Sequence, residues 1–171
     1  MYQDFKDLLS AFNAHRVKYL IIGGYAVALH ARPRATQDLD LFIKADPANA
    51  QAIYAALASF GAPMESIRVE DLADRSSFIR FGREPVSVDI HSNIPGVEFD
   101  AAWERRVEAV IDPQSGLKAF FLSRDDLVAS KLASGRTRDL ADAEEIREAG
   151  GSQGADAPRR SSKPTHNNPS Q

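Results

Sequence analysis

The sequence predicts an α/β (α+β) domain in which helices flank a mixed β-sheet and two further helices follow at the C-terminal end. Three observations lead to this fold class. The chain has 171 residues, which suits one domain, and 43% of them are hydrophobic, a share typical of a protein with a core. Apolar residues recur at helical spacing in some segments and form short strand-like runs in others. Glycine, proline and capping residues separate these segments.

The first half of the predicted domain alternates helices with two strands. Phe5, Leu8 and Phe12 recur at helical spacing and predict an amphipathic helix. Asp46 followed by Pro47 predicts the start of a later helix, because an N-cap acid with proline at the first helical position is a favoured beginning. The elements expected here are a helix at 3–14, a strand at 17–22, a helix at 25–30, a strand at 38–43 and a helix from 46 to about 60.

The second half is expected to contain a hairpin, two more strands and three helices. The sequence GREP (82–85) joins two apolar runs in the manner of a hairpin turn. Ser123 resembles an N-cap, with Asp125 and Asp126 in the first helical turn. The elements expected here are strands at 77–81, 86–91, 107–111 and 117–122, and helices at 99–106, 123–134 and 137–149.

The predicted domain covers residues 1–149, with a core at about 15–122 and C-terminal helices at about 123–149. Residues 150–171 contain no Leu, Ile, Val, Phe, Met, Trp or Tyr, so we expect a disordered tail there. The formal net charge of the chain is −3, but this tail holds three basic residues and one acidic residue, so the domain carries −5. An acidic domain does not favour nucleic-acid binding through its overall electrostatic field.

The composition also limits the compartment and the kind of site. There is no cysteine, which excludes disulfides and thiolate metal sites and makes a reducing cytoplasm the expected location. No apolar run is long enough to span a membrane, and the acidic start of the chain does not resemble a signal peptide. We therefore expect a cytoplasmic protein without a membrane partner.

Two acids in one predicted strand indicate a metal site. Side chains alternate across a strand, so Asp38 and Asp40 project from the same face. Phe42 shares that face, and like charges beside apolar groups are unfavourable unless a cation lies between them. Asp89 occupies a similar position in a later strand, so three carboxylates could form an oxygen-rich site for Mg²⁺. The alternative is an exposed edge strand whose acids merely oppose aggregation.

A glycine pair separates the strand at 17–22 from the helix that follows. Gly23 and Gly24 would leave backbone N–H groups at a helix N-terminus, where a phosphate binds well. The alternative is an ordinary tight turn. His91, on the face of Asp89, could contact a substrate or could be a solvated histidine at a strand end.

Several of these residues occur in an order that resembles a known family. The segments YLIIGGYAVALH (19–30) and RATQDLDL (34–41) are followed by Asp89, by Lys131 on the penultimate helix and by RDLAD (138–142). This order resembles the nucleotidyltransferase core of the DNA polymerase β superfamily. It is most similar to the bacterial group of AbiEii-type toxins and minimal nucleotidyltransferases of toxin–antitoxin pairs.

The resemblance implies a nucleotidyltransferase-type mixed sheet and a role for each matching residue. Asp38, Asp40 and Asp89 would be catalytic and would hold two Mg²⁺ ions, with Mn²⁺ as a substitute. Asp89 would act on the acceptor side, as a metal ligand or a general base. Residues Gly23, Gly24, Thr36 and Lys131 would bind the nucleotide.

The implied reaction moves a nucleoside monophosphate from a nucleoside triphosphate such as ATP to an acceptor hydroxyl and releases pyrophosphate. The acceptor would be a protein, the 3′ end of a tRNA or a small molecule. The protein would belong to a toxin–antitoxin or phage-defence pair, with a cognate toxin or antitoxin as partner. The alternative is a catalytically inactive member of the same fold that binds a nucleotide or a partner protein.

Overall fold

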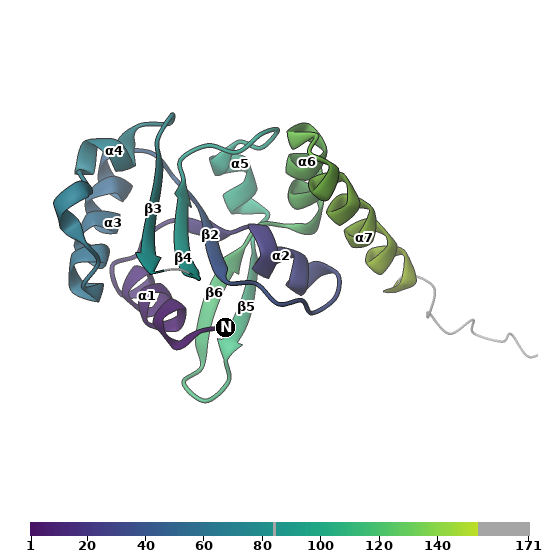
Figure 1. Cartoon of the computed structure of the whole chain (residues 1–171), viewed down its shortest axis with the longest axis horizontal. Coiled ribbons are helices and arrows are strands. Elements are labelled where there is room, and N and C mark those ends of the chain that lie inside the picture. Colours follow the sequence, from purple (N-terminus) through teal and green to yellow (C-terminus); the bar gives the residue numbers. More distant parts are fainter. Residues whose placement is uncertain (84, 154–171) are drawn as a thin grey trace, which may run out of the picture.

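A six-stranded β-sheet organises the residues that the computed structural model describes, which are 1–83 and 85–153. Its order is β3-β4-β2-β1-β6-β5, and Figure 1 shows β3, β4 and β2 next to one another. Strand β2 runs parallel to β4, and β1 runs parallel to β6, whereas the other neighbouring strands are antiparallel. The strands are β1 Tyr19–Ile21, β2 Asp38–Ile43, β3 Phe78–Arg83, β4 Val86–His91, β5 Val107–Asp112 and β6 Leu117–Phe121. The predicted mixed sheet is confirmed.

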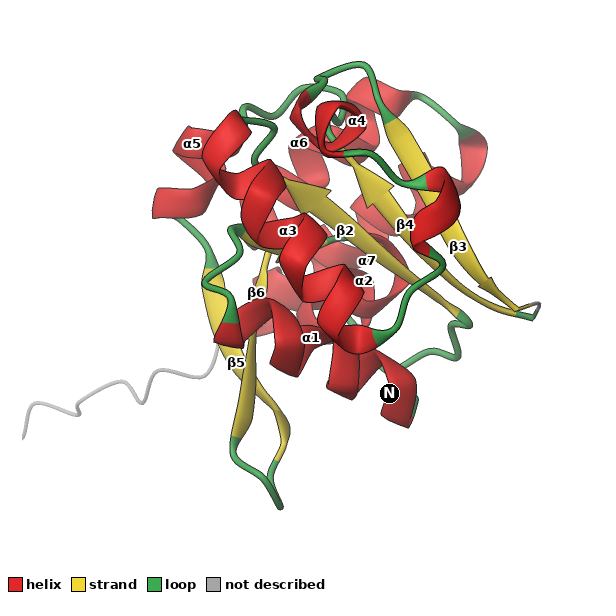
Figure 2. Ribbon diagram, turned by 90° about the vertical axis from the view of Figure 1, so that its left-hand side faces the viewer, coloured by secondary structure: helices red, strands yellow, loops and turns green. Residues whose placement is uncertain are grey.

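Helices pack against this sheet and extend it at one end. Helices α1 and α3 cross one face side by side (Figure 2), while α6 and α7 lie at the end of the molecule away from α3 and α4 (Figure 1). The helices are α1 Gln3–Ala14, α2 Gly23–His30, α3 Pro47–Phe60, α4 Val69–Ala73, α5 Phe99–Glu104, α6 Arg124–Ser134 and α7 Thr137–Gln153, with a 3₁₀ turn at Met64–Ser66. Over the described part of the chain, no helix combines the length and apolar character needed to cross a membrane.

The core lies on the apolar side of the central strand. Leu39, Leu41 and Ile43 of β2 are fully buried, as are Leu8 and Leu9 of α1. Burial of each such side chain contributes about 1.5–3 kcal/mol to folding. Since side chains alternate along β2, burial of this side directs Asp38 and Asp40 toward the other face.

Local capping signals predicted two helix starts correctly. The Asp46 side chain accepts a hydrogen bond of 2.7 Å from the backbone N–H of Asn49, and Ser123 accepts one of 3.2 Å from Asp126. The 3₁₀ turn and α4 were not predicted, because such short segments carry too few residues for a periodic pattern. Of the predicted hairpin turn at 82–85, residue 84 lies outside the described residues.

Helix α7 continues past residue 149, the predicted end of the domain, and ends at Gln153. The helix therefore includes the first four residues of the segment predicted to be a disordered tail. The absence of a side chain at Gly150 lets the Arg124 guanidinium lie against the helix there, and no proline interrupts this stretch. The rest of the predicted tail, 154–171, lies outside the described residues.

Candidate active site

The polar face of three neighbouring strands brings together residues that are far apart in the sequence. Parallel pairing of β2 and β4 sets Asp38 opposite Ser87 and Asp40 opposite Asp89. Antiparallel pairing of β3 with β4 sets Arg80 opposite Asp89 from the other side. Because paired residues of adjacent strands project from the same face, these five side chains occupy one surface of the sheet.

A compact group of potential metal ligands lies on this surface. One ligand atom each from Asp40, Asp89 and His91 lies within 4.8 Å of the other two. The Nε2 atom of His91 is 3.7 Å from Oδ1 of Asp40. Asp89 is buried, while Asp40 and His91 are partly exposed. Two carboxylates and an imidazole at these separations form a donor set that fits a divalent cation.

Asp38 does not belong to this group. Its Oδ1 atom accepts a hydrogen bond of 2.7 Å from the hydroxyl of Ser87. On this face of the sheet, the pair formed by Asp38 and Ser87 lies next to the pair formed by Asp40 and Asp89. The structure thus brings two of the three predicted acids together and adds a histidine, while Asp38 remains two residues away on the same face.

The most prominent contact that the sequence did not predict joins Arg80 to Asp89. Arg80 donates from Nε to Oδ1 and from Nη2 to Oδ2 of Asp89, both at 2.6 Å. These hydrogen bonds raise the pKa of Arg80 above its ordinary value, and the Arg80 side chain is still 60% exposed. The sequence feature that could have indicated this contact is the position of Arg80 between Ile79 and Phe81 in an otherwise apolar run. The positive charge of the guanidinium offsets the repulsion between the neighbouring carboxylates of Asp40 and Asp89.

The glycine pair allows α2 to begin directly beside β2. Gly23 has a φ of +61°, and a Cβ atom there would overlap the carboxylate of Asp40. The backbone N–H of Ile22 donates to the carbonyl of Asp40 at 2.9 Å. A Cβ atom on Gly24 would lie 2.6 Å from Oγ1 of Thr36. The two glycines and Thr36 therefore meet at the start of α2, as close backbone approach requires.

Lys131 lies in a buried ion-pair network between α6, α7 and the segment before β2. Its Nζ atom is 2.7 Å from Oδ1 of Asp139 and 2.8 Å from Oδ2 of Asp142. Arg136 pairs with Asp139, and Arg34 with Asp142, each at 2.6 Å. Both acids are buried, and the Lys131 side chain is 12% exposed. The predicted phosphate-binding lysine thus also holds the C-terminal helices in place.

This network makes folding stability sensitive to acid. Burial raises the pKa of Asp139, but hydrogen bonds from Lys131, Ser134 and Arg136 outweigh burial and hold it at about 2, below the ordinary 3.8. A carboxyl whose pKa is lower in the folded state stabilises the protein above about pH 4, and this contribution is lost as the pH falls toward 2. We expect Asp139→Asn to show a smaller fall in unfolding free energy between pH 5 and pH 3 than the unmodified chain. Urea titrations at both pH values measure the unfolding free energies, and an equal fall in the two proteins would contradict the lowered pKa of Asp139.

A small cavity connects the sheet surface with the C-terminal helices. Its volume is about 150 Å³, and its lining includes Gly23, Asp40, His91, Lys131 and Arg136. These residues come from α2, β2, β4, α6 and the turn before α7. The cavity therefore joins the glycine turn, part of the ligand group and the predicted phosphate-binding lysine in one place.

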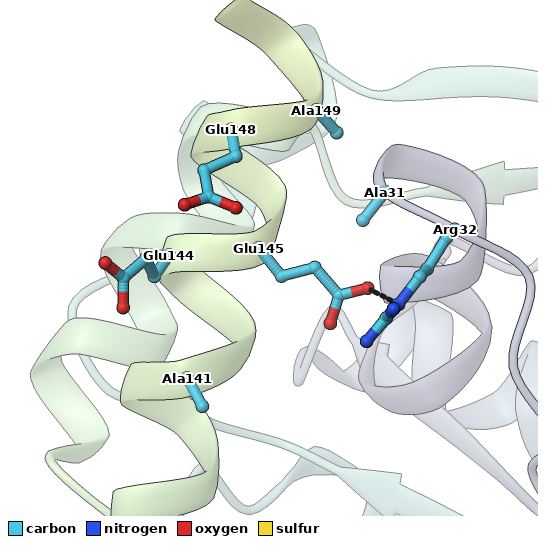
Figure 3. A pocket seen from close by; sticks show the side chains of 7 residues that line it. All are labelled: Ala31, Arg32, Ala141, Glu144, Glu145, Glu148 and Ala149. Carbon is cyan, nitrogen blue, oxygen red and sulfur yellow. Dashed lines mark ion pairs between the residues drawn. The ribbon is translucent and has the colours of Figure 1, made fainter.

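A second hollow, of about 520 Å³, lies between α7 and the segment that follows α2 (Figure 3). Arg32 projects toward Glu145 across it, and its Nε atom is 2.7 Å from Oε1 of that residue. The lining residues are Ala31, Arg32, Ala141, Glu144, Glu145, Glu148 and Ala149. None of the predicted site residues lines it, and it begins at the end of α2 opposite Gly23.

Comparisons with known proteins concern the family and the fold of the chain. A family model described as "Nucleotidyltransferase of unknown function (DUF6036)" matches residues 2–149. No curated protein matches the sequence. Among solved structures, the lincomycin-bound lincosamide antibiotic adenylyltransferase LnuA is similar, with 18% identity and a TM-score of 0.56 over 87% of this chain and 98% of that one. At this identity the likeness concerns the fold.

Proposed function

This chain belongs to the family of nucleotidyltransferases of unknown function that its sequence matches over residues 2–149, and from that premise we propose a specific reaction. The enzyme moves a nucleoside monophosphate from a nucleoside triphosphate to an acceptor hydroxyl, and pyrophosphate leaves. The reaction takes place at the sheet surface that carries Asp40 and Asp89.

One observation carries this proposal, namely the ligand group formed by Asp40, Asp89 and His91 beside the glycine turn. A divalent cation held there, Mg²⁺ or Mn²⁺, would supply charge stabilisation for the phosphates. Asp38 lies on the same face, and in this proposal it is a ligand of a second ion, as the sequence resemblance implies. Gly23 and Lys131 belong to the nucleotide side, because both line the cavity beside Asp40. Gly24 and Thr36, which lie close together at the start of α2, complete that side as the sequence resemblance implies.

The acceptor is proposed to be a small molecule or a protein hydroxyl rather than a tRNA. Residues 1–149 carry a net charge of −5, which opposes binding of a polyanion. LnuA is described as an adenylyltransferase of lincosamide antibiotics, which are small molecules, and its fold is similar. The resemblance to AbiEii-type toxins and minimal nucleotidyltransferases supports a protein acceptor within a toxin–antitoxin or phage-defence pair.

Label transfer tests the reaction and identifies the acceptor class. The full chain is incubated with each α-³²P-labelled nucleoside triphosphate, Mg²⁺ or Mn²⁺ and a cell lysate, which is then separated into protein, RNA and small-molecule fractions. A parallel incubation with the Asp40→Asn variant gives the background. We expect label above this background in the protein or small-molecule fraction. If no triphosphate labels any fraction with either metal, the proposed reaction is wrong.

The Gly23→Ala variant is expected to fold less stably and to lose most transfer. A side chain at positive φ costs about 1–2 kcal/mol, and the added Cβ must also displace the Asp40 carboxylate. Gly116→Ala is a matched control, since Gly116 has a φ of +69° and no atom within 4 Å of the added Cβ. Urea unfolding should show a loss in both variants, whereas label transfer should fall only for Gly23→Ala. Full transfer activity in Gly23→Ala would contradict the role of this close approach.

A second candidate function is nucleotide or partner binding without turnover. It is favoured by the engagement of Asp89 with Arg80 and of Lys131 with two acids. In that case the protein would bind a triphosphate in calorimetry, and Asp89→Asn would leave binding of nucleotide or partner intact, while no fraction would ever be labelled. The active enzyme should instead lose label transfer on Asp89→Asn and keep its fold.

A further inference from the structure

The ligand group of the proposed site contains an imidazole where a site built only for Mg²⁺ would need oxygen. His91 is the last residue of β4 and lies two residues after Asp89, so both side chains project from one face. In the register of the sheet, His91 stands opposite Phe42 on β2 and opposite Phe78 on β3. On this face of β4, the side chain of His91 is therefore the next one after that of Asp89.

The ring of Phe78 packs against this imidazole. The rings of Phe78 and His91 have their centroids 5.0 Å apart and are tilted by 56°. Phe42, on the other side, is buried and packs edge-on against Phe99. The His91 side chain is 29% exposed, and it lines the cavity that also contains Asp40. The ring is thus packed but still reachable from the cavity.

The nitrogen atoms of His91 are available to a ligand. The 3.7 Å between Nε2 and Asp40 Oδ1 exceeds hydrogen-bond distance. Over residues 1–83 and 85–153, no hydrogen bond to either ring nitrogen is present. Asp89, in contrast, has both oxygens engaged by Arg80. Asp40 and His91 are therefore the two members of the group that an incoming cation can reach without breaking a short ion pair.

We propose that His91 is a direct metal ligand together with Asp40 and Asp89, and that this centre selects a divalent transition-metal ion over Mg²⁺. This inference rests on the metal site of the proposed function and specifies its metal. Mg²⁺ binds through oxygen and keeps its waters, whereas imidazole nitrogen favours first-row transition ions. Replacement of one oxygen ligand by nitrogen therefore changes which ion the site prefers.

Mn²⁺ is the probe for this proposal, because it reports on both affinity and ligand type. The full chain without a histidine tag is titrated with Mn²⁺, alone and with a methylene-bridged triphosphate analogue, and free Mn²⁺ is measured by electron paramagnetic resonance. Pulsed measurements on the bound ion are expected to show coupling to a directly bonded ¹⁴N nucleus. Mg²⁺ affinity follows from its competition with Mn²⁺ and is expected to be weaker.

Three variants complete the test. His91→Gln is expected to weaken Mn²⁺ binding by about tenfold or more and to remove the ¹⁴N coupling, since even the loss of a residue that only orients a ligand costs about 10–100-fold. His91→Asp offers oxygen in place of nitrogen, so it should still bind metal, show no ¹⁴N coupling and shift preference toward Mg²⁺. His15→Gln is the matched control, because His15 lies at the C-terminal end of α1 near Ser59. This variant should bind Mn²⁺ as the unmodified chain does and keep the ¹⁴N coupling.

The outcomes separate this inference from the proposed reaction. Bound Mn²⁺ without ¹⁴N coupling, equal Mn²⁺ affinity in His91→Gln, or no Mn²⁺ binding at all would overturn the assignment of His91. Label transfer with Mg²⁺ in such a protein would leave the proposed reaction standing. Conversely, ¹⁴N-coupled Mn²⁺ in a chain that labels no fraction would support the ligand and reject the reaction.

Discussion

Replacement of Asp40 by Asn is expected to reduce nucleotidyl transfer by about a thousandfold or more. A bound metal contributes several kcal/mol of charge stabilisation, and each 1.4 kcal/mol corresponds to a tenfold change in rate. Asp40 is the acid that is shared by the ligand group, the glycine turn and the cavity. Initial rates of label transfer at saturating triphosphate measure the effect.

The fold should survive this replacement. Asn has nearly the same shape as Asp, and its neutral amide removes repulsion toward Asp89, so we expect the unfolding free energy to change by less than about 1 kcal/mol. Asp71→Asn is the control, since Asp71 pairs with Arg68 on the exposed surface of α4. It should keep the full rate. An Asp40→Asn variant that transfers nucleotide at more than a tenth of the normal rate would exclude this carboxylate as a metal ligand.

Replacement of Lys131 by Met is expected to destabilise the protein by about 3–5 kcal/mol. Removal of one partner from a buried ion pair leaves the other charge uncompensated, and here two buried acids, Asp139 and Asp142, lose the ammonium that they share. The variant should also transfer nucleotide poorly at temperatures where it stays folded, because Lys131 lines the cavity beside Asp40. Urea unfolding at pH 7 and label transfer at low temperature measure the two effects.

A surface lysine provides the comparison. Lys118 pairs with Glu108 at 2.7 Å, and both side chains are about half exposed, so Lys118→Met should cost less than about 1 kcal/mol. A similarly small cost for Lys131→Met would mean that Arg34 and Arg136 alone compensate the two acids. Normal transfer by folded Lys131→Met would limit Lys131 to its role between the helices.

Periodic segments of the fold were predictable from the sequence. The strands at 38–43 and 86–91 and the helix at 3–14 have the predicted bounds, because alternation and helical spacing depend only on neighbouring residues. The observed elements differ from the predicted ones where the sequence pattern is short or polar. The first strand is limited to Tyr19–Ile21, α2 begins at Gly23 itself, and α4 was not predicted.

From the sequence alone it follows that Asp38 and Asp40 share a face of one strand, that a glycine pair lies where a strand gives way to a helix, and that the chain resembles nucleotidyltransferases. These properties are local, or depend on the order of short motifs, and no folding is needed to read them. In the structure, that pair, Gly23 and Gly24, forms the first two residues of α2. The family match over residues 2–149 confirms the enzyme class.

Which of these groups meet depends on the tertiary structure. Arg80 pairs with Asp89, and His91 joins Asp40, because the registers of β3 with β4 and of β2 with β4 align residues from separate segments. Lys131 meets two buried acids because α6 packs against α7. Such contacts depend on strand register and helix packing between distant parts of the chain, which a local pattern does not specify.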